Sequence, residues 1–424
     1  MKVFLPLIFS FALTTPVHAL SIDGARLNGT LQKLAEFGKN PKGGVSRVAY
    51  SEADKNGREY VLSLMKQAGL ATSVDTAGNL IGIRNGSKPD LKPIIIGSHI
   101  DSVPEGGNYD GIVGSLSAIE VAQTLQDHNR FLRHTLKVIV FQNEEGGHLG
   151  SRAVTSGLTP DDLALTSLSG KKIGEGIGFI GGDPDRLEQG KIAKGDFAAY
   201  IELHIEQGGV LEAEKAIIGV VEGIVGIRRW NVTVTGVPNH AGTTPMRMRR
   251  DAMVGAAEFI SGIHKLILKT HGRQVGTVGK IDAEPGAPNV IPGKVRFTFE
   301  VRDLDSKKLE KLYQDALSLA HRIEKENGTA FDFKETYNTA PVLTDDFIKS
   351  QIKAAARNRS FRTLGLPSGA GHDAQEFARL GPMGMIFIPS RNGVSHSPEE
   401  FSSPEEVADG AQVLFDAVEL VDQR

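Results

Sequence analysis

Residues 92–114 read KPIIIGSHIDSVPEGGNYDGIVG, and this stretch decides the fold that we predict. Its consecutive isoleucines do not alternate with polar residues, which is typical of a strand buried on both faces of a parallel sheet. A helical pattern follows at 114–126, and further strand patterns lie at 80–84 and 136–142. Strand, helix and strand at this spacing indicate βαβ units. We therefore expect an α/β fold with a largely parallel sheet and flanking helices.

Polar side chains gather where these strands end. His99 follows the buried isoleucines, and Asp110 stands just before the helical pattern. Similar positions occur in NEEGG, LHIEQ and SHSPE further along the chain: Glu144, Glu145, His204 and His396. Taken singly, such residues are usually structural, because a histidine after a strand is commonly hydrogen-bonded and an Asp-Gly pair is commonly a turn. In open α/β sheets, however, ligands bind outside the carboxyl ends of the strands, so the sheet would bring these residues together.

The composition restricts the chemistry of such a site. The chain has 424 residues and no cysteine, which excludes disulfides, thiolate metal sites and a cysteine nucleophile. Any metal must therefore be held by histidine and carboxylate side chains. With 48 Lys+Arg against 51 Asp+Glu, the formal net charge is −3. Nothing in this balance indicates a surface that follows a phosphate backbone, so we expect no nucleic-acid partner.

Histidines and carboxylates together form a ligand set that suits zinc and related divalent ions. Two metal ions need about six protein donor atoms, which five residues can supply if one carboxylate bridges. The five candidates are His99, Asp110, Glu145, His204 and His396. Glu144 could then take a proton from a bound water, and Asp101 could accept the other ring N–H of His99 to set its tautomer. The residue types thus predict a metal-dependent hydrolase.

The chain begins with MKVFLPLIFSFALTTPVHA, residues 1–19. An early lysine, a short apolar run and small residues before position 20 are typical of a secretory signal, although a buried N-terminal strand or helix is the alternative. The run is shorter than the roughly 20 apolar residues that span a bilayer. We expect cleavage after Ala19 and an exported protein, periplasmic or secreted, with no membrane association after the signal is removed.

The middle of the chain has a different pattern. RWNVTVT, residues 229–235, alternates with period two, and the helix and strand patterns up to residue 338 follow the order β-α-β-β-α-β. This order is the split βαβ layout of a small two-layer α+β domain. We expect a catalytic metal-binding domain formed by residues 20–224 and 339–424, interrupted by an inserted lid and dimerisation domain at 225–338.

Several motifs together resemble one family. In chain order they are GSHIDSVP, NYDGIVG, QNEEGG, ELHIEQG, VPNHAGTTPM, APNVIPG, EVRD, SGAGHDAQ and SHSPEEF. This set resembles the N-carbamoyl-L-amino-acid hydrolase / allantoate amidohydrolase family, within the di-zinc superfamily that includes aminoacylases and carnosinases. The resemblance covers residues 25–420, and the motif set is specific. The short gap from His99 to Asp110, and the histidine in ELHIEQG, resemble the amidohydrolase branch more than the peptidases.

The resemblance implies a role for each metal ligand. His99 and His204 would each belong to one metal, and Asp110 would bridge both. Glu145 and His396 would complete the second metal.

The resemblance also implies residues that act on the substrate. Glu144 would be the general base and later the general acid, and His240 would stabilise the oxyanion, reaching into the site of a partner subunit. The remaining substrate contacts would be Gln207, Asn289, Arg302, Gly369 and Ala370. Arg302 has a planar guanidinium that matches a carboxylate with two hydrogen bonds. The inserted domain would join two chains into a homodimer.

The predicted activity is cleavage of the ureido C–N bond of N-carbamoyl-L-amino acids or a related ureido acid, with release of ammonia and carbon dioxide. Two divalent ions would serve as cofactors; zinc suits the ligands, and manganese, cobalt or nickel could fill the same site. The nearest alternatives are an allantoate amidohydrolase and a β-ureidopropionase, which use the same groups. Further alternatives are a dipeptidase or aminoacylase, and a non-catalytic exported binding protein.

Overall fold

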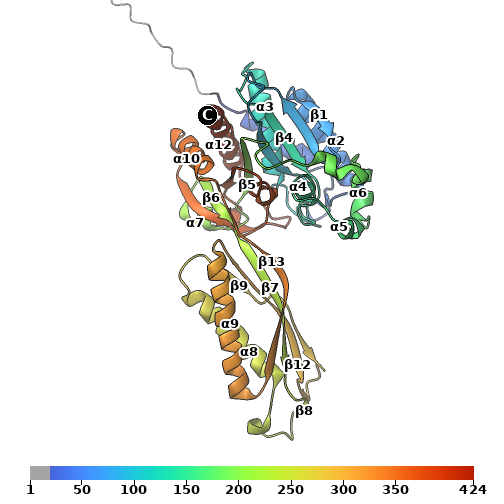
Figure 1. Ribbon diagram of the computed structural model, residues 1–424, viewed down its shortest axis with the longest axis vertical. Helices are drawn as coiled ribbons and strands as arrows, with labels where there is room; N and C mark the ends of the chain where they lie inside the picture. Colours follow the sequence, from blue (N-terminus) through green and yellow to red (C-terminus); the bar gives the residue numbers. More distant parts are fainter. Residues whose placement is uncertain (1–19) are drawn as a thin grey trace, which may run out of the picture.

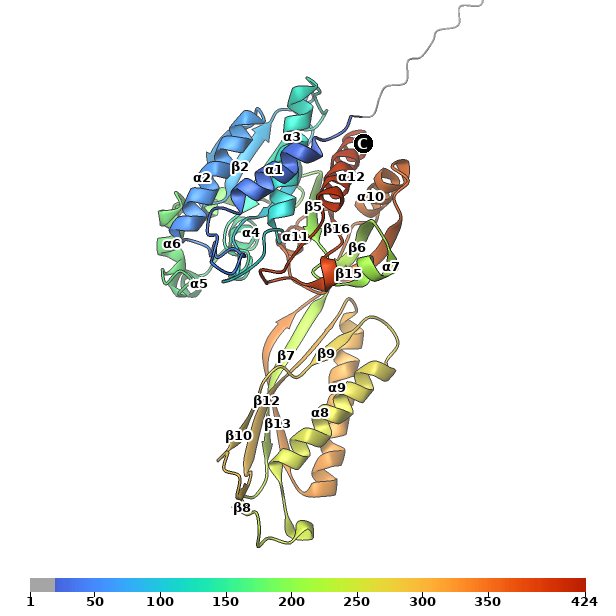
Figure 2. The ribbon, with the colours of Figure 1, turned by 180° about the vertical axis from the view of Figure 1, so that it is seen from behind.

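The computed structural model describes residues 20–424, which form two bodies (Figures 1 and 2). The upper body contains a nine-stranded sheet and both ends of the described chain, and the lower body contains a five-stranded sheet. The predicted export signal, residues 1–19, lies outside the described residues and stays a prediction. Within the described residues, no helix is both long and apolar enough to cross a membrane.

The upper sheet has the strand order β1-β2-β4-β3-β5-β16-β6-β14, and β15 also pairs with β6. Its strands are β1 (Ala71–Val74), β2 (Leu80–Arg84), β3 (Ile94–His99), β4 (Leu136–Phe141), β5 (Ala199–Ile205), β6 (Ile218–Ile224), β14 (Val342–Leu343), β15 (Thr363–Ser368) and β16 (Met383–Ile388). The four central strands, β4-β3-β5-β16, run parallel to one another. The antiparallel pairs lie toward the two sides of the sheet. The predicted α/β fold with a largely parallel central sheet is confirmed.

Helices cover both faces of this sheet. One face carries α1 (Gly24–Leu34), α2 (Glu52–Gln67), α3 (Ile112–Asp127), α10 (Asp346–Asn358) and α12 (Pro404–Asp422). The other carries α4 (Leu149–Val154) and α11 (Asp373–Phe377). The short helices α5 (Pro160–Ala164), α6 (Ile173–Phe179) and α7 (Val210–Glu214) lie at the periphery. Ile94 and Ile96 pack in the first layer and Ile95 in the second, so β3 is buried on both faces as its sequence predicts.

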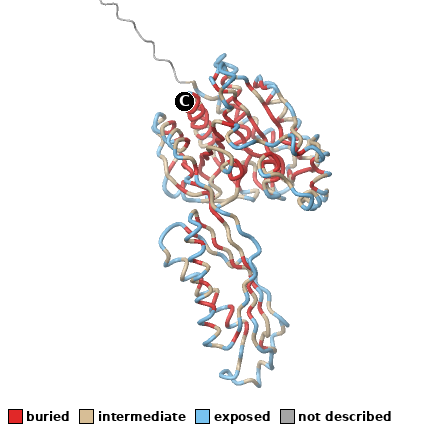
Figure 3. Tube along the Cα trace, viewed as in Figure 1, coloured by how far each residue is buried: buried red, intermediate tan, exposed pale blue. Residues whose placement is uncertain are grey.

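The lower body is a two-layer α+β unit. Its elements are β7 (Gly226–Thr235), β8 (Asn239–His240), α8 (Ala252–Lys269), β9 (Val275–Thr277), β10 (Ile281–Glu284), β11 (Val290–Ile291), β12 (Lys294–Asp303), α9 (Ser306–Asn327) and β13 (Ala330–Thr339). The sheet order is β10-β12-β7-β13, with β9 on β12, and β8 pairs with β11. Helices α8 and α9 cover one face over a core that includes Trp230, Phe259 and Leu312. Figure 3 shows that buried residues are concentrated in the upper body and along this layer, whereas the lower tip is exposed.

Two chain segments join the bodies. Strand β7 begins directly after β6, and β13 ends just before β14, so the chain enters and leaves the lower body at neighbouring points (Figure 1). These two connections lie next to residues 225 and 338, the boundaries predicted from the sequence for the inserted domain. The division into domains stays a prediction.

Helix α3 lies very close to the sheet, and this close packing places the loop that precedes the helix. A Cβ on Gly114 would lie 2.1 Å from the carbonyl oxygen of Leu203 in β5 and 2.8 Å from the Cβ of Ser98 in β3. No side chain fits there, because backbone atoms on one side cannot move without shifting the strand. The glycine therefore holds the N-terminal end of α3 against the ends of β3 and β5.

We expect Gly114→Ala to lower the free energy of unfolding by about 1–3 kcal/mol, the usual cost of overpacking. Urea unfolding followed by far-ultraviolet circular dichroism measures this, since the single tryptophan, Trp230, reports only on the lower body. Gly29→Ala, at an exposed position of α1, is the control, because a Cβ there meets nothing within 4 Å. Equal stability of the two variants would contradict the close packing of α3.

Candidate metal centre

The parallel strands of the upper sheet bring distant polar residues to one edge. His99 is the last residue of β3, and Glu144 and Glu145 follow the end of β4. His204 lies near the end of β5, and His396 follows β16 after a turn. Because parallel strands end at the same edge of a sheet, these residues meet in space although the chain separates them widely. Glu144, Glu145 and His396 line a cleft of about 280 Å³ that also includes residues of the lower body, whereas His99 and His204 are buried.

Asp110 lies at the centre of this cluster. Its Oδ1 is 3.2 Å from Nε2 of His204 and 3.5 Å from Nε2 of His99. Its Oδ2 is 3.1 Å from Nε2 of His396, which in turn lies 3.5 Å from Oε1 of Glu145. One carboxylate thus faces two imidazoles with one oxygen and a third with the other, which is the arrangement of a bridging ligand.

The donor atoms fit a divalent cation. Two groups of three residues have ligand atoms within 4.8 Å of one another: His99, Asp110 and His204, and Asp110, Glu145 and His396. The Nε2 atom of His99 is fully buried and has no hydrogen-bond partner, which is costly unless a ligand satisfies it. These nitrogen and oxygen donors can therefore hold metal, as their chemistry predicts.

A third group, Glu202, His204 and His372, also has ligand atoms within 4.8 Å. Here the protein itself uses the donor atoms. The Glu202 carboxylate accepts hydrogen bonds from Ser98 Oγ and Tyr200 Oη, both at 2.8 Å. The Nε2 atom of His372 lies 2.8 Å from Oγ of Ser368. Because Glu202 and His372 are already hydrogen-bonded within the protein, we do not assign a cation to this third group.

Negative charge is concentrated in the cluster. Burial, followed by the charge of Asp110, raises the pKa of Glu145 to about 7. Burial also raises the pKa of Glu144 well above its ordinary value. The hydrogen bond to Asp110 raises the pKa of His396 to about 9, and contacts with the surrounding histidines outweigh burial and hold the pKa of Asp110 well below its ordinary value. Bound protons on the glutamates and on His396 therefore balance part of the negative charge of the cluster. A divalent cation could supply the same positive charge.

Asp101 supports the glutamate pair. Its carboxylate accepts hydrogen bonds from the backbone N–H of Glu144 at 3.1 Å and of Glu145 at 3.2 Å. Its Oδ1 is 3.6 Å from Nδ1 of His99, but the backbone carbonyl oxygen of Asp101 is nearer, at 3.1 Å. The contact predicted between Asp101 and the His99 ring is therefore made chiefly by the main chain, and the carboxylate holds the two glutamates.

Glu400 supports Asp110 from the other side, and the sequence patterns did not single it out. Its Oε1 accepts the backbone N–H groups of Tyr109 at 2.9 Å and Asp110 at 3.1 Å. Its Oε2 accepts the hydroxyl of Ser395 at 2.8 Å and the N–H of His396 at 3.2 Å. One carboxylate thus connects the loop of Asp110 to the loop of His396. The acidic residues of SPEEF were the only signal, and they are usual on a surface.

Four of the predicted substrate residues lie beside the cluster: Gln207, Arg302, Gly369 and Ala370. The Nε2 atom of Gln207 donates to Oδ2 of Asp110 at 2.6 Å. Arg302, on β12 of the lower body, reaches across to donate from Nη1 to the carbonyl oxygen of Gly369 at 2.6 Å. Its Nε also donates to Glu300 at 2.7 Å. Ala370 lines the same cleft.

His240 and Asn289 lie far from the cluster within this chain. They belong to the exposed lower tip, where β8 and β11 pair and the N–H of Ala241 donates to the carbonyl oxygen of Asn289 at 3.0 Å. Figures 1 and 2 place β8 at the end of the lower body opposite the upper sheet. A single chain therefore does not bring these two residues to the metal centre.

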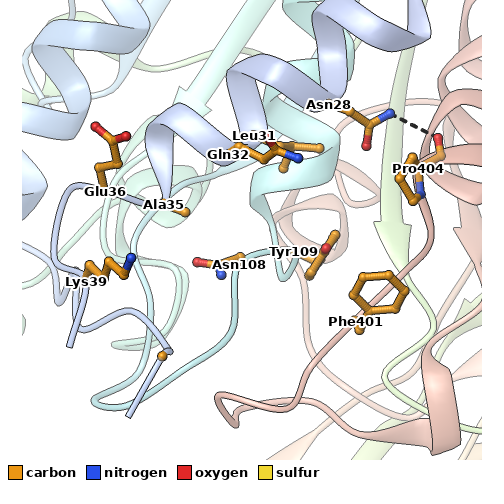
Figure 4. Close-up of a pocket in the computed structure, with 11 residues that line it drawn as sticks. Asn28, Leu31, Gln32, Ala35, Glu36, Lys39, Asn108, Tyr109, Phe401 and Pro404 are labelled. Carbon is orange, nitrogen blue, oxygen red and sulfur yellow. Dashed lines mark hydrogen bonds between the residues drawn. The ribbon is translucent and has the colours of Figure 1, made fainter. Parts of the chain in front are cut away.

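Two further cavities adjoin the centre. One of about 970 Å³ extends from Gln207 and His396 along the apolar side chains of Leu364, Leu366 and Val275. The other, of about 350 Å³, lies between α1 and the loop that precedes Asp110 (Figure 4). Figure 4 shows Asn108 and Tyr109 beside the cavity, with Phe401 near Tyr109. The residues that line this cavity include no member of the metal cluster.

The sequence and structure resemble known hydrolases. A family model described as "Peptidase family M20/M25/M40" matches residues 95–420. The chain is 40% identical over 402 residues to an N-carbamoyl-L-amino acid amidohydrolase of Geobacillus stearothermophilus, covering 94% of this chain and 98% of that protein. It is 35% identical to a ureidoglycolate hydrolase of Arabidopsis thaliana, covering 93% of this chain and 86% of that protein.

A solved structure shows a similar arrangement. The crystal structure of an amidase of the hydantoinase/carbamoylase family from Burkholderia multivorans superimposes with a TM-score of 0.89 at 36% sequence identity. The match covers 96% of this chain and 99% of that chain.

We expect a saturating divalent cation such as zinc to raise the melting temperature, because a ligand at ~100 times its Kd stabilises the folded state by about 2.7 kcal/mol. Asp110→Asn should lose most of this shift, since it removes a charge from both groups of donors. Asp127→Asn, at the exposed C-terminal end of α3, the helix that follows Asp110, is the matched control and should keep the shift. Thermal unfolding with cation or chelator measures the effect, and an undiminished shift in Asp110→Asn would contradict the assignment.

Proposed function

Because this chain belongs to the peptidase family M20/M25/M40, we propose that it is a binuclear metal-dependent amidohydrolase acting on N-carbamoyl-L-amino acids. The broader class, a hydrolase of carbon–nitrogen bonds in linear amides, follows from the relatives that it matches over nearly its whole length. The observation that carries the proposal is the Asp110 carboxylate, which belongs to both groups of donor atoms. A shared carboxylate supports two ions rather than one.

His99, His204 and Asp110 could together hold the first ion. Alternatively, His99 could bind one ion and His204 the other. In both arrangements Asp110 would bridge the two ions. Glu145 and His396 would complete the second. Zinc suits these donors, and manganese, cobalt or nickel could fill the same positions. When bound, the ions would polarise the ureido carbonyl and lower the pKa of the attacking water.

Glu144 is proposed as the group that moves the proton. Its Oε2 lies 3.7 Å from Nε2 of His99, on the side of the proposed ligands. The carboxylate would accept a proton from the attacking water and deliver it to the leaving nitrogen. One water and the ureido group then yield the amino acid, ammonia and carbon dioxide. A buried carboxylate with a raised pKa is suited to this exchange, because it can hold the proton between the two steps.

The substrate would lie between the two bodies. Arg302 is proposed to exchange its contact with the Gly369 carbonyl for the substrate carboxylate, and Gln207 and Ala370 would line the ureido group. His240 and Asn289 would be supplied by the lower body of a second chain, where they could donate to the developing oxyanion. Their distance from the cluster within one chain supports a homodimer joined through the lower body. We also propose export, on the basis of residues 1–19.

Other ureido acids are the nearest alternatives. Allantoate and β-ureidopropionate would use the same groups, and a relative named for ureidoglycolate supports this breadth. The apolar wall formed by Leu364 and Leu366 favours N-carbamoyl amino acids with apolar side chains, because neither allantoate nor ureidoglycolate has such a group. A dipeptidase or aminoacylase would cleave an N-acyl bond, which lacks the terminal NH₂ group.

We expect purified protein loaded with zinc to release ammonia from N-carbamoyl-L-amino acids faster than from allantoate, β-ureidopropionate or ureidoglycolate. Matched N-acetyl amino acids, assayed for the free amino acid, distinguish an aminoacylase. Glu144→Gln should lower kcat by about 10²–10⁴ while retaining metal, because general acid–base catalysis contributes this much. Glu59→Gln, on an exposed position of α2, is the control. Cleavage of acyl bonds alone would contradict the proposal.

Mixing two inactive variants tests the partner's contribution. His240→Ala and Glu144→Gln should each be nearly inactive, but subunit exchange would place one intact site in every mixed dimer. A 1:1 mixture should therefore recover about a quarter of the wild-type activity if dimers form at random around a two-fold axis. The measurement is ammonia release after co-refolding, with each variant refolded alone as the control. No recovery would contradict the contribution of His240 from a second chain.

A further inference from the structure

His148 lies against the carboxylate of Glu144, a contact that its sequence position did not suggest. Its Nε2 is 3.4 Å from Oε1 of Glu144. The turn brings the ring back over the glutamate, because the N–H of His148 donates to the carbonyl oxygen of Glu144 at 2.8 Å. His148 adopts a left-handed backbone conformation with φ of 56°, which costs free energy for a residue other than glycine.

The ring has little freedom to leave this position. A Cβ on Gly371 would lie 2.6 Å from Cε1 and 2.8 Å from Nε2 of His148, so the imidazole rests directly on that glycine. Gly371 belongs to the loop between β15 and α11, and this loop lines the same cleft. The side chain is only 20% exposed. The ring is therefore held between Glu144 and the opposite wall of the cleft.

The two oxygens of Glu144 face two different imidazoles. Oε2 lies 3.7 Å from Nε2 of His99, and Oε1 lies 3.4 Å from Nε2 of His148. Burial lowers the pKa of His148 to about 4, so its ring is neutral at neutral pH. A neutral imidazole can donate only from its protonated nitrogen, so a hydrogen bond to Oε1 of Glu144 requires the tautomer that carries the proton on Nε2.

We propose that His148 is a positioning residue that donates from Nε2 to Oε1 of Glu144, which leaves Oε2 directed toward the proposed metal ligands. This inference rests on the proposed function, in which Glu144 moves the proton. The 3.4 Å contact is longer than a good hydrogen bond, and such contacts commonly shorten when the substrate closes the site. A neutral donor also adds no charge that would prevent Glu144 from taking a proton.

The kinetic test compares His148→Ala, His148→Gln and the control His264→Ala, which changes an exposed histidine on α8. We expect His148→Ala to lower kcat about 10–100-fold, the usual cost of losing a group that orients a reactive side chain, with KM and bound metal nearly unchanged. His148→Gln keeps an N–H donor and should recover part of kcat. An unchanged kcat, a rise in KM alone, or loss of metal would each overturn the positioning role.

A spectroscopic test does not need turnover and therefore separates this inference from the proposed function. Long-range ¹⁵N–¹H correlation spectra of the zinc-loaded protein report the protonated nitrogen of each histidine, and His148→Gln assigns the signals. We expect the Nε2–H tautomer in the wild type and a shift toward mixed tautomers in Glu144→Ala. Identical His148 nitrogen shifts in both proteins would overturn the inference. If the contact is present but no ureido acid is cleaved, the proposed function fails and the inferred contact stands.

Discussion

The carboxylate of Asp110 is the constraint on which the rest of the site depends. Burying an ionised carboxylate is costly unless hydrogen bonds and opposite charge compensate for the lost water. Here the side chain meets three imidazoles and the amide of Gln207, while Glu400 accepts its backbone N–H. These contacts require the ends of β3, β5 and β16 to lie side by side. The parallel strands at the centre of the sheet and the close packing of α3 therefore hold the side chains that contact Asp110 in place.

Several other carboxylates lie buried around Asp110, namely Asp101, Glu144, Glu202 and Asp373. Hydrogen bonds satisfy some of them: Asp101 holds the backbone of the glutamate pair, and Glu202 accepts from Ser98 and Tyr200. Burial, together with the neighbouring negative charges, raises the pKa of both Glu144 and Glu145. A cluster of this kind stores an electrostatic cost that a divalent ion relieves, so binding a metal and stabilising the fold are linked.

The two bodies contribute differently to the cleft. The upper body supplies the candidate ligands and Glu144 from strand ends, where the backbone is held by the sheet. The lower body supplies Arg302 from β12, and its hydrogen bond to the carbonyl oxygen of Gly369 ties the two walls together. His240 and Asn289 stand at the opposite end of the lower body. Under the proposed function, a second chain would place these donors over the substrate, and movement of the bodies would bring the groups together.

Much of this could be read from the amino-acid sequence. The unalternated isoleucines of β3 indicated a doubly buried strand, and the structure confirms it. The β-α-β-β-α-β order expected for the middle of the chain does not show that β9 and β10 are separate strands, each of which pairs with a different part of β12. Between them the carbonyl oxygen of Lys280 accepts the N–H of Thr298, so the chain continues along β12 without regular pairing. Local periodicity identifies a strand, but it does not show where the pairing is interrupted.

The fold class and the polar residues at the strand ends could be predicted before any contact was known, and the absence of cysteine left only histidine and carboxylate as ligands. Each of these follows from local pattern or from chemistry that does not depend on contacts. The folded chain was needed to show which oxygen of Asp110 faces which imidazole, that Glu400 joins two loops, and that His148 lies over Glu144. The contacts of Asp110 depend on how neighbouring strands are aligned. The contact of His148 depends on its left-handed backbone conformation and on Gly371 on the opposite wall of the cleft. Such geometry arises from packing between distant segments, so no local pattern contains it.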